Sequence, residues 1–167
     1  MRTVKPARLL RLHLSEHDRH EGKPLYEAVV DRCRELGIAV TAYGVLSRGL
    51  LSGSLKNGPG DIRNRFPRFA DENAVQNQKL VSRLAEIASG KGITQSQLAV
   101  AWALAKSPSI IPVIGSRTRA QLAESLAALE VILTPAEITE IESSVSAEAV
   151  AGTRYDAHQM QVLDSER

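Results

Sequence analysis

Residues 24–53 read PLYEAVVDRCRELGIAVTAYGVLSRGLLSG, and this stretch decides the fold class. Apolar side chains recur at helical steps through residues 24–36, with Pro24 suited to the first turn and a glycine to the C-terminal cap. The run that follows, residues 38–43, is short, apolar and β-rich between two glycines, which is typical of a fully buried parallel strand. A helix leading directly into such a strand favours an α/β protein.

The order of helix and strand repeats further along the chain. One amphipathic helix is expected to end near Gly90, and the capping-box pair Thr94 and Gln97 predicts that another begins there, with Leu98, Ala101, Trp102 and Ala105 facing inward. Residues 110–114 predict a second short buried strand. It contains Pro112, which cannot donate to a ladder and is expected near a strand end or an irregularity.

Two more helices are predicted toward the C-terminus. Residues 118–129 and residues 134–145 each begin with a threonine capping signal. The tail after Gly152 is expected to be irregular, and alternating leucines at residues 10–14 are typical of an earlier strand. Repeating β/α units are therefore the one pattern that organises the chain.

Composition narrows the class of protein. The 167 residues suit one globular domain, and 43% hydrophobic content suffices for an ordinary core. A net charge of +2, from 21 basic and 19 acidic residues, gives no drive toward nucleic acid. The lone cysteine, Cys33, cannot form an internal disulfide, and no run suits a signal peptide or membrane span. We expect a soluble, cytoplasmic protein.

Two places could hold a ligand. Residues 115–118 join a strand to a helix start, where Gly115 admits a phosphate close to the backbone, Ser116 adds a hydroxyl and Arg117 offers a planar fork. Residues 43–50 follow the other strand, at the end where α/β folds bind ligands. A plain capped turn and an ordinary turn remain the alternative interpretations. The long aperiodic loop over residues 44–71 is typical of a functional or mobile segment.

Other motifs carry no assignment. The chain contains no G-x-G-x-x-G, Walker, nucleophile-elbow or zinc-helix motif. The spacing of His13, His17 and His20 would suit a metal only on a helix, and the charge-rich context favours solvated histidines. Cys33 and Trp102 fit packing positions. No metal ligand and no catalytic residue is assigned.

Residues 33–38 and 42–53 closely resemble the seventh-strand region of aldo/keto reductases. Further matches follow in the order of that family, at residues 65–69, 72–73, 97–102, 111–117, 133–135 and 152–155. The resemblance extends from about residue 25 to residue 155, which is most of the chain.

The resemblance implies a fold in which this chain forms part of a (β/α)8 TIM barrel. Such a barrel needs about 250 residues, so we expect a truncated chain with the last two to three β/α units plus a C-terminal helix. Residues 24–155 are then the C-terminal half of an aldo/keto reductase barrel. Residues 1–23 form an unaligned N-terminal segment and residues 156–167 a tail.

The resemblance also implies NADP(H)-dependent reduction of an aldehyde or ketone to an alcohol. The family's catalytic Asp, Tyr, Lys and His belong to the other half of the barrel, so no catalytic residue is expected here. Tyr43 matches the aromatic residue that stacks on the nicotinamide, and Ser116 and Arg117 match the residues that bind the 2′-phosphate. Ser125 stands where the family usually has Asn, which puts an adenine contact in doubt. The predicted cofactor residues are Tyr43, Gly44, Leu46, Arg48 and Gly49, the last four wrapping the pyrophosphate, Gly115, Ser116 and Arg117, and Gln121, Glu124 and Ser125 near the adenosine.

Three functional interpretations stay open at this point. The chain could act as a reductase, on a small carbonyl substrate, once a second polypeptide supplies its other half. It could instead be a non-catalytic NADP-binding or interaction module, with self-association through an open strand edge. The third interpretation is a nonfunctional fragment whose inward-facing side chains lack opposite strands. None of the three involves nucleic acid or a membrane.

Overall fold

The computed structural model describes residues 19–20, 23–53 and 58–161. The predicted strand at residues 10–14 and the side chains of the three spaced histidines lie outside the described part. The helices and strands are β1 (Arg19–His20), β2 (Lys23–Pro24), α1 (Leu25–Glu35), β3 (Val40–Tyr43), η1 (Ser47–Gly49), η2 (Ile62–Arg65), η3 (Pro67–Phe69), α2 (Asp71–Gly90), α3 (Gln95–Lys106), β4 (Ile110–Val113), α4 (Arg119–Ala127), η4 (Ala128–Glu130), α5 (Pro135–Ser144), η5 (Ala147–Ala149) and α6 (Ala157–Gln161).

Strands β3 and β4 form a parallel pair, with Val40 opposite Ile110 and Ala42 opposite Pro112. The backbone N–H of Val40 donates to the carbonyl of Ser109 at 2.8 Å. Because parallel strands alternate the edge toward which each N–H points, this bond places position 112 on the edge away from β3. Pro112 is the residue before the last one of β4 and does not interrupt the ladder, so the prediction that it lies near a strand end is confirmed.

Within the described residues, the two strands are covered on one face only. Along each strand burial alternates, so that Thr41 and Tyr43 of β3 and Ile111 and Val113 of β4 are exposed while their neighbours are partly covered. The sequence predicted two fully buried strands, and this prediction was wrong for the described residues. An apolar run is typical of a strand that is covered on both faces, whereas the described helices lie on one face of this sheet.

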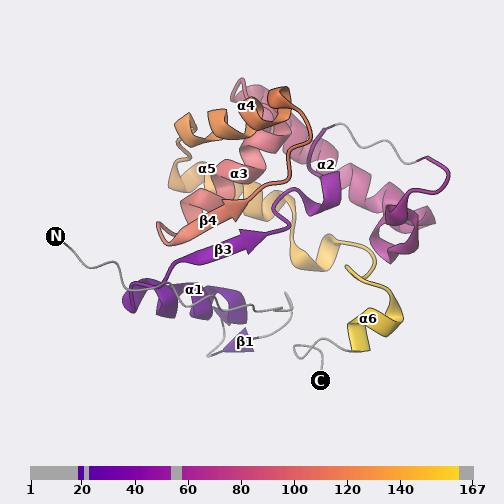
Figure 1. The fold of residues 1–167 in the computed structure, drawn as a ribbon, viewed down its shortest axis with the longest axis horizontal. Helices are drawn as coiled ribbons and strands as arrows, with labels where there is room; N and C mark the ends of the chain where they lie inside the picture. Colours follow the sequence, from indigo (N-terminus) through magenta and orange to yellow (C-terminus); the bar gives the residue numbers. More distant parts are fainter. Residues whose placement is uncertain (1–18, 21–22, 54–57, 162–167) are drawn as a thin grey trace.

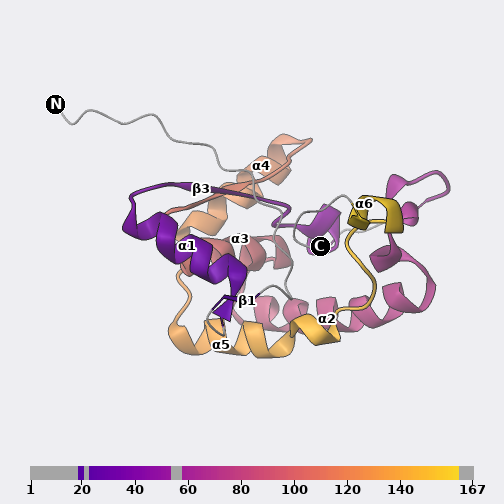
Figure 2. The same cartoon turned by 90° about the horizontal axis from the view of Figure 1, so that it is seen from below.

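The helices are arranged in tiers beneath the sheet (Figures 1 and 2). Helices α1 and α3 lie against the covered face, and α2 and α5 lie beyond α3. The side view also places β3 at the outside of the described tiers. The result is an α/β architecture built on a small parallel sheet.

The core lies where α2, α3 and α5 meet. Ala88, Leu98 and Ile141 are almost fully buried, with partly buried side chains packed around them. Of the residues predicted to face inward on α3, Leu98 and Ala101 are buried and Trp102 is partly buried, but Ala105 is exposed. Burial of this kind contributes about 25 cal/mol per Å² of apolar surface, and the core therefore fixes α3, the helix beneath both strands.

The predicted helix starts are confirmed in detail. At Thr94, Thr118 and Thr134 the side chain accepts the N3 backbone N–H and the N3 side chain accepts the N-cap N–H. The tail differs from its prediction, since α6 is a short helix. Cys33 is buried in α1 as expected. Among the described residues, every helix is too short or too polar to cross a lipid bilayer.

Candidate functional site

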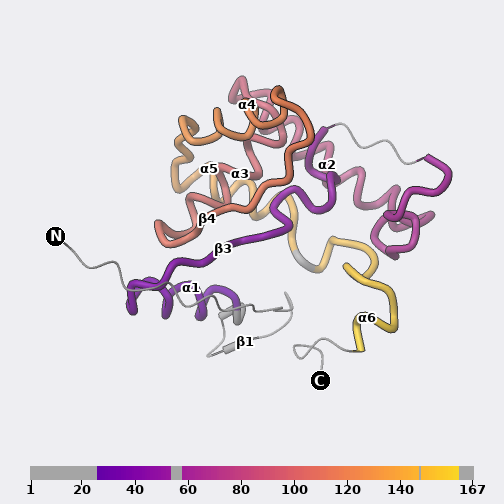
Figure 3. The backbone as a smooth tube through the Cα atoms, in the orientation of Figure 1, coloured from indigo at the N-terminus to yellow at the C-terminus, as the bar shows by residue number. Residues whose placement is uncertain are grey.

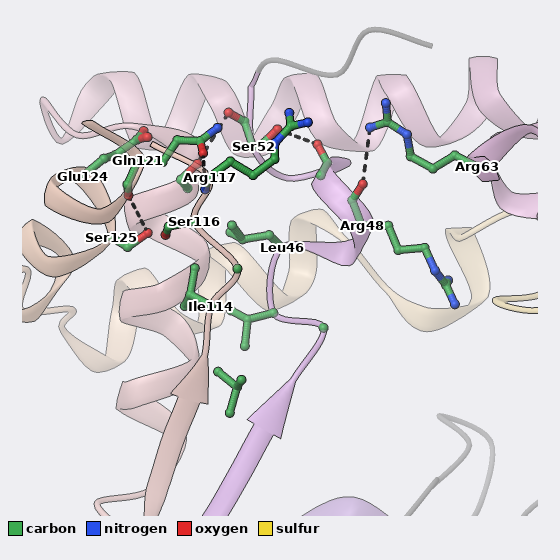
Figure 4. A pocket seen from close by; sticks show the side chains of 16 residues that line it. Leu46, Arg48, Ser52, Arg63, Ile114, Ser116, Arg117, Gln121, Glu124 and Ser125 are labelled. Atoms are coloured by element: carbon green, nitrogen blue, oxygen red, sulfur yellow. Dashed lines mark hydrogen bonds between the residues drawn. The ribbon is translucent and has the colours of Figure 1, made fainter. Parts of the chain in front are cut away.

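A cleft of about 660 Å³ opens at the carboxyl ends of the two strands. One wall is the loop after β3, and the other is the turn that joins β4 to α4 (Figure 4). The lining residues are Gly44, Val45, Leu46, Arg48, Gly49, Ser52, Arg63, Ser96, Val113, Ile114, Gly115, Ser116, Arg117, Gln121, Glu124 and Ser125. Both walls therefore come from segments that follow a parallel strand, where α/β folds bind ligands.

The turn before α4 is fixed by the side chain of Gln121. Its Oε1 accepts from the backbone N–H of Arg117 at 2.8 Å and from that of Thr118 at 3.2 Å. Thr118 completes the capping box by accepting from the N–H of Gln121 at 3.2 Å. This turn aims the positive end of the α4 dipole at the cleft, which favours an anion.

Arg117 is the cation of that turn. Its side chain is exposed and extends toward the loop that follows β3 (Figure 4). Within the part of the chain that the structure describes, no carboxylate forms an ion pair with it. A Cβ built on the neighbouring Gly115 would meet no atom within 4 Å, so the backbone there borders open space. A phosphate could approach both groups without displacing a side chain.

The opposite wall is a tightly curled loop with several left-handed residues. Gly44 and Gly49 have φ of 76° and 90°, and the intervening Ser47 and Arg48 have φ of 47° and 54°. The curl is closed by bonds from the N–H of Ser47 to the carbonyl of Gly44 at 2.7 Å and from that of Leu51 to Leu46 at 3.2 Å. Backbone N–H groups in such turns can form concave surfaces that suit anions, although those of Ser47, Gly49, Leu50 and Leu51 already donate within the loop.

Hydroxyl groups tie this loop to α3. Ser52 Oγ donates to the carbonyl of Gly49 at 2.7 Å, and Ser96 Oγ donates to the carbonyl of Ser52 at 3.4 Å. Ser96 lies in the first turn of α3, which packs under β4. The loop is thereby anchored to the same helix that supports the other wall.

Arg63 is the second cationic side chain described in the cleft lining, and it forms an ion pair with Asp61. The guanidinium Nε lies 2.9 Å from Asp61 Oδ1, and the N–H of Arg63 donates to the same oxygen at 2.9 Å. These bonds lower the pKa of the Asp61 carboxyl to about 2, and the bond from the Arg63 side chain has the largest effect. The same pairing raises the pKa of Arg63. Arg63 also donates to the carbonyl of Arg48 at 3.4 Å, so it braces the curled loop.

The structure brings the predicted cofactor residues together with one exception. All of them except Tyr43 line the cleft. Tyr43 lies at the end of β3 on the exposed face of the sheet, and its side chain is 55% exposed. Whether these residues bind a cofactor stays a prediction. The predicted cofactor residues did not include Ser52, Arg63, Ser96, Val113 and Ile114, nor Val45, although Val45 lies within the predicted ligand stretch at residues 43–50.

Two of the predicted adenosine residues already take part in hydrogen bonds within the protein. Ser125 Oγ donates to the carbonyl of Gln121 at 3.0 Å, one turn earlier in α4. The carbonyl of Glu124 accepts from Gln97 Nε2 at 3.4 Å, which joins α4 to α3. Ser125 therefore keeps only acceptor capacity toward a ligand, whereas an Asn amide would offer donors as well. No group of three potential metal ligands occurs in the described part of the chain.

Comparisons with known proteins agree with this architecture. Residues 23–146 match the model of the aldo/keto reductase family. The aldo-keto reductase yakc of Schizosaccharomyces pombe, whose name specifies NADP(+), is 37% identical over 131 residues. A glycerol dehydrogenase of Gluconobacter oxydans superposes with a TM-score of 0.68 at 24% identity, which shows similarity of fold.

The matches cover most of this chain and less than half of either relative. The alignment with the yeast protein spans 76% of this chain and 38% of that protein. The superposition spans 81% of this chain and 42% of the dehydrogenase. The similarity therefore concerns a part of those proteins, and what a whole relative does is not thereby shown for this chain.

Proposed function

The chain belongs to the aldo/keto reductase family, and from that premise we propose that it forms the NADP(H)-binding part of an oxidoreductase that reduces an aldehyde or ketone to an alcohol. One observation carries the proposal. The family-matched residues of the loop after β3 and of the turn before α4, far apart in sequence, line a single cleft. The NADP(+) in the name of the yeast relative supports the choice of cofactor.

The turn before α4 supports a phosphomonoester rather than a neutral group. Arg117 offers a planar guanidinium with no carboxylate partner among the described residues, beside the hydroxyl of Ser116. We propose that both bind the adenosine 2′-phosphate, which NADP(H) has and NAD(H) lacks. Gln121 would act indirectly, because its side chain holds the backbone of Arg117 and Thr118.

The curled loop supports a second anionic contact. Its left-handed residues surround one side of the cleft, and Arg63 adds positive charge that Asp61 partly offsets. We propose that Gly44, Leu46, Arg48 and Gly49 hold the pyrophosphate mainly through the backbone.

Reduction itself requires more than this cleft. The bound cofactor would supply the hydride. Tyr43, at the carboxyl end of β3, would present its ring to the nicotinamide from the exposed face of the sheet. We propose that the proton donor and its partners come from polypeptide outside the residues described here, and that the chain alone contributes binding and orientation.

The exposed face of the sheet supports a partial barrel. Ile111 and Val113 are each 53% exposed, on the same face as Tyr43. In a (β/α)8 barrel these positions face the interior, where strands from across the barrel would cover them. We propose that such strands come from further polypeptide, either more of the same protein or a separate chain. Alternatively, the exposed apolar face would pair with a second copy of this chain.

Arg117→Ala tests the cofactor assignment. We expect NADPH affinity to fall about 10- to 100-fold, which corresponds to loss of charge-assisted hydrogen bonds. NADH affinity should change little, because NADH has no 2′-phosphate. Titration with each nucleotide, followed by Trp102 quenching, measures both. Arg119→Ala, which removes an equal charge from a residue outside the cleft, is the matched control.

The alternatives predict different outcomes. A non-catalytic NADP-binding module predicts the same titrations and no carbonyl reduction even when the remaining barrel strands are supplied. A nonfunctional fragment predicts no saturable binding and no cooperative melt. Equal losses for NADPH and NADH on Arg117→Ala would contradict the assignment of the 2′-phosphate site.

A further inference from the structure

The side chain of Arg48 points away from the cleft that its backbone lines (Figure 4). Its guanidinium carbon lies 4.0 Å from the centroid of the Phe66 ring and 4.8 Å from that of Tyr155. The two rings meet edge to face, with centroids 6.3 Å apart. Arg48 Nη1 also donates to the carbonyl of Arg154 at 2.9 Å. The charge of Arg48 is therefore engaged on the side of the loop opposite to the cleft.

The backbone of the same residue is strained. Arg48 has φ 54° and ψ 31°, and Ser47 before it has φ 47°. A left-handed conformation is unfavourable for a residue with a Cβ, and two in succession need restraint from outside the loop. A cation held between two aromatic rings gains electrostatic attraction, which offsets part of this cost.

The restraint comes from residues 149–156, which we call the C-terminal strap. Figure 3 shows the chain after α5 turning back toward the loop that precedes α2. Asn77 of α2 is 2% exposed and binds the strap twice, by donating to the carbonyl of Ala151 at 2.8 Å and accepting its N–H at 2.9 Å. Gly152 packs directly on the backbone of Pro67. These contacts fix the backbone of the strap, and so they hold the Tyr155 ring against Arg48.

We propose that Arg48 is a positioning residue, which Phe66 and Tyr155 clamp so that the backbone of residues 46–49 keeps the shape that receives the cofactor's diphosphate. The strap becomes part of the binding site in this way, although none of its described residues lines the cleft. The inference rests on the proposed NADP(H) function. A direct contact of the Arg48 guanidinium with the diphosphate does not fit its direction or its partners.

The test removes a ring without touching the cleft. Tyr155→Leu deletes one side of the clamp, and Tyr155→Phe restores the ring. Affinity is measured for NADPH, ADP and 2′-AMP. ADP carries a diphosphate and no 2′-phosphate, whereas 2′-AMP carries a 2′-phosphate and no diphosphate. With Tyr155→Leu we expect about tenfold weaker binding of NADPH and ADP and unchanged binding of 2′-AMP. Tyr155→Phe should recover the affinity for both weakened ligands.

Each other outcome has a definite meaning. Unchanged ADP affinity in Tyr155→Leu, or an equal loss for ADP and 2′-AMP, overturns the proposal, because the strap would then be irrelevant or merely structural. Failure of the unaltered protein to bind NADPH would contradict the proposed function. In that case, hydrogen exchange would test separately whether Phe66 and Tyr155 restrain the loop through Arg48. Faster exchange of the bonded amides of Leu50, Leu51 and Ser52 in Tyr155→Leu than in Tyr155→Phe supports the clamp, and equal exchange overturns it.

Discussion

At the scale of single residues, position 152 requires glycine, because no other side chain fits there. Its φ is +76°, and a Cβ built there would lie 2.8 Å from the carbonyl carbon and oxygen of Pro67. Gly152→Ala should therefore destabilise the protein by more than about 1 kcal/mol in urea unfolding, since it adds both strain and a clash with backbone. Gly90→Ala is the control, because a Cβ there meets nothing within 4 Å and Ala favours the helix. Equal effects of the two substitutions would contradict this account.

Residue identities predicted one wall of the cleft better than the other. Ser116 and Arg117 follow a strand and precede a capped helix, so local sequence already places them at a helix N-terminus. Arg63 and Ser96 were missed because their place depends on how the long loop folds back over α3. The role of the Arg48 side chain was also beyond the sequence, because its partner Tyr155 lies more than a hundred residues away.

At the scale of elements, helix α5 depends on an ionised carboxylate. Glu137 completes its capping box and binds Lys91, and the bond to Lys91, followed by those to Thr134, lowers the pKa of this carboxyl from 4.5 to about 2. A depressed pKa stabilises the folded state above the unfolded pKa, and this contribution is lost as the pH falls from about 4.5 toward 2. Glu137→Gln keeps the cap oxygen and removes the charge. Its deficit in unfolding free energy at pH 7 should shrink by pH 3, and a constant deficit would exclude the ion pair as the cause.

The sequence predicted the starts of the helices that begin with a threonine capping box. The threonine caps at 94, 118 and 134 fixed three helix starts, because each capping box satisfies its own backbone donors within four residues. The helix α6 was predicted as irregular, although Asp156 before it is a typical N-cap residue whose carboxylate accepts from the N–H of Gln159 at 2.8 Å. Pro112 was correctly expected near a strand end, since it precedes the last residue of β4 and its nitrogen faces the edge away from β3.

At the scale of the whole molecule, the exposed sheet face marks the limit of what the described part can satisfy by itself. Tyr43, Ile111 and Val113 lie together on that face, where apolar surface remains in contact with water. Local periodicity correctly indicated apolar strands and could not indicate which face the helices would leave open. That face follows from the number of strands that pack together and from the side on which the helices lie, which no single segment encodes.

The cleft joins the two β/α units, so a ligand bound in it should stabilise them as one. Ligand at a hundredfold excess over its Kd adds about 2.7 kcal/mol, which for a protein of this size raises Tm by roughly 5–10 °C. We expect a single transition by circular dichroism that shifts by this amount with NADPH, and a smaller shift for Arg117→Ala at the same NADPH concentration. A second transition that NADPH leaves in place would show that α1 and β3 melt apart from β4 and α4, and that the cleft does not couple them.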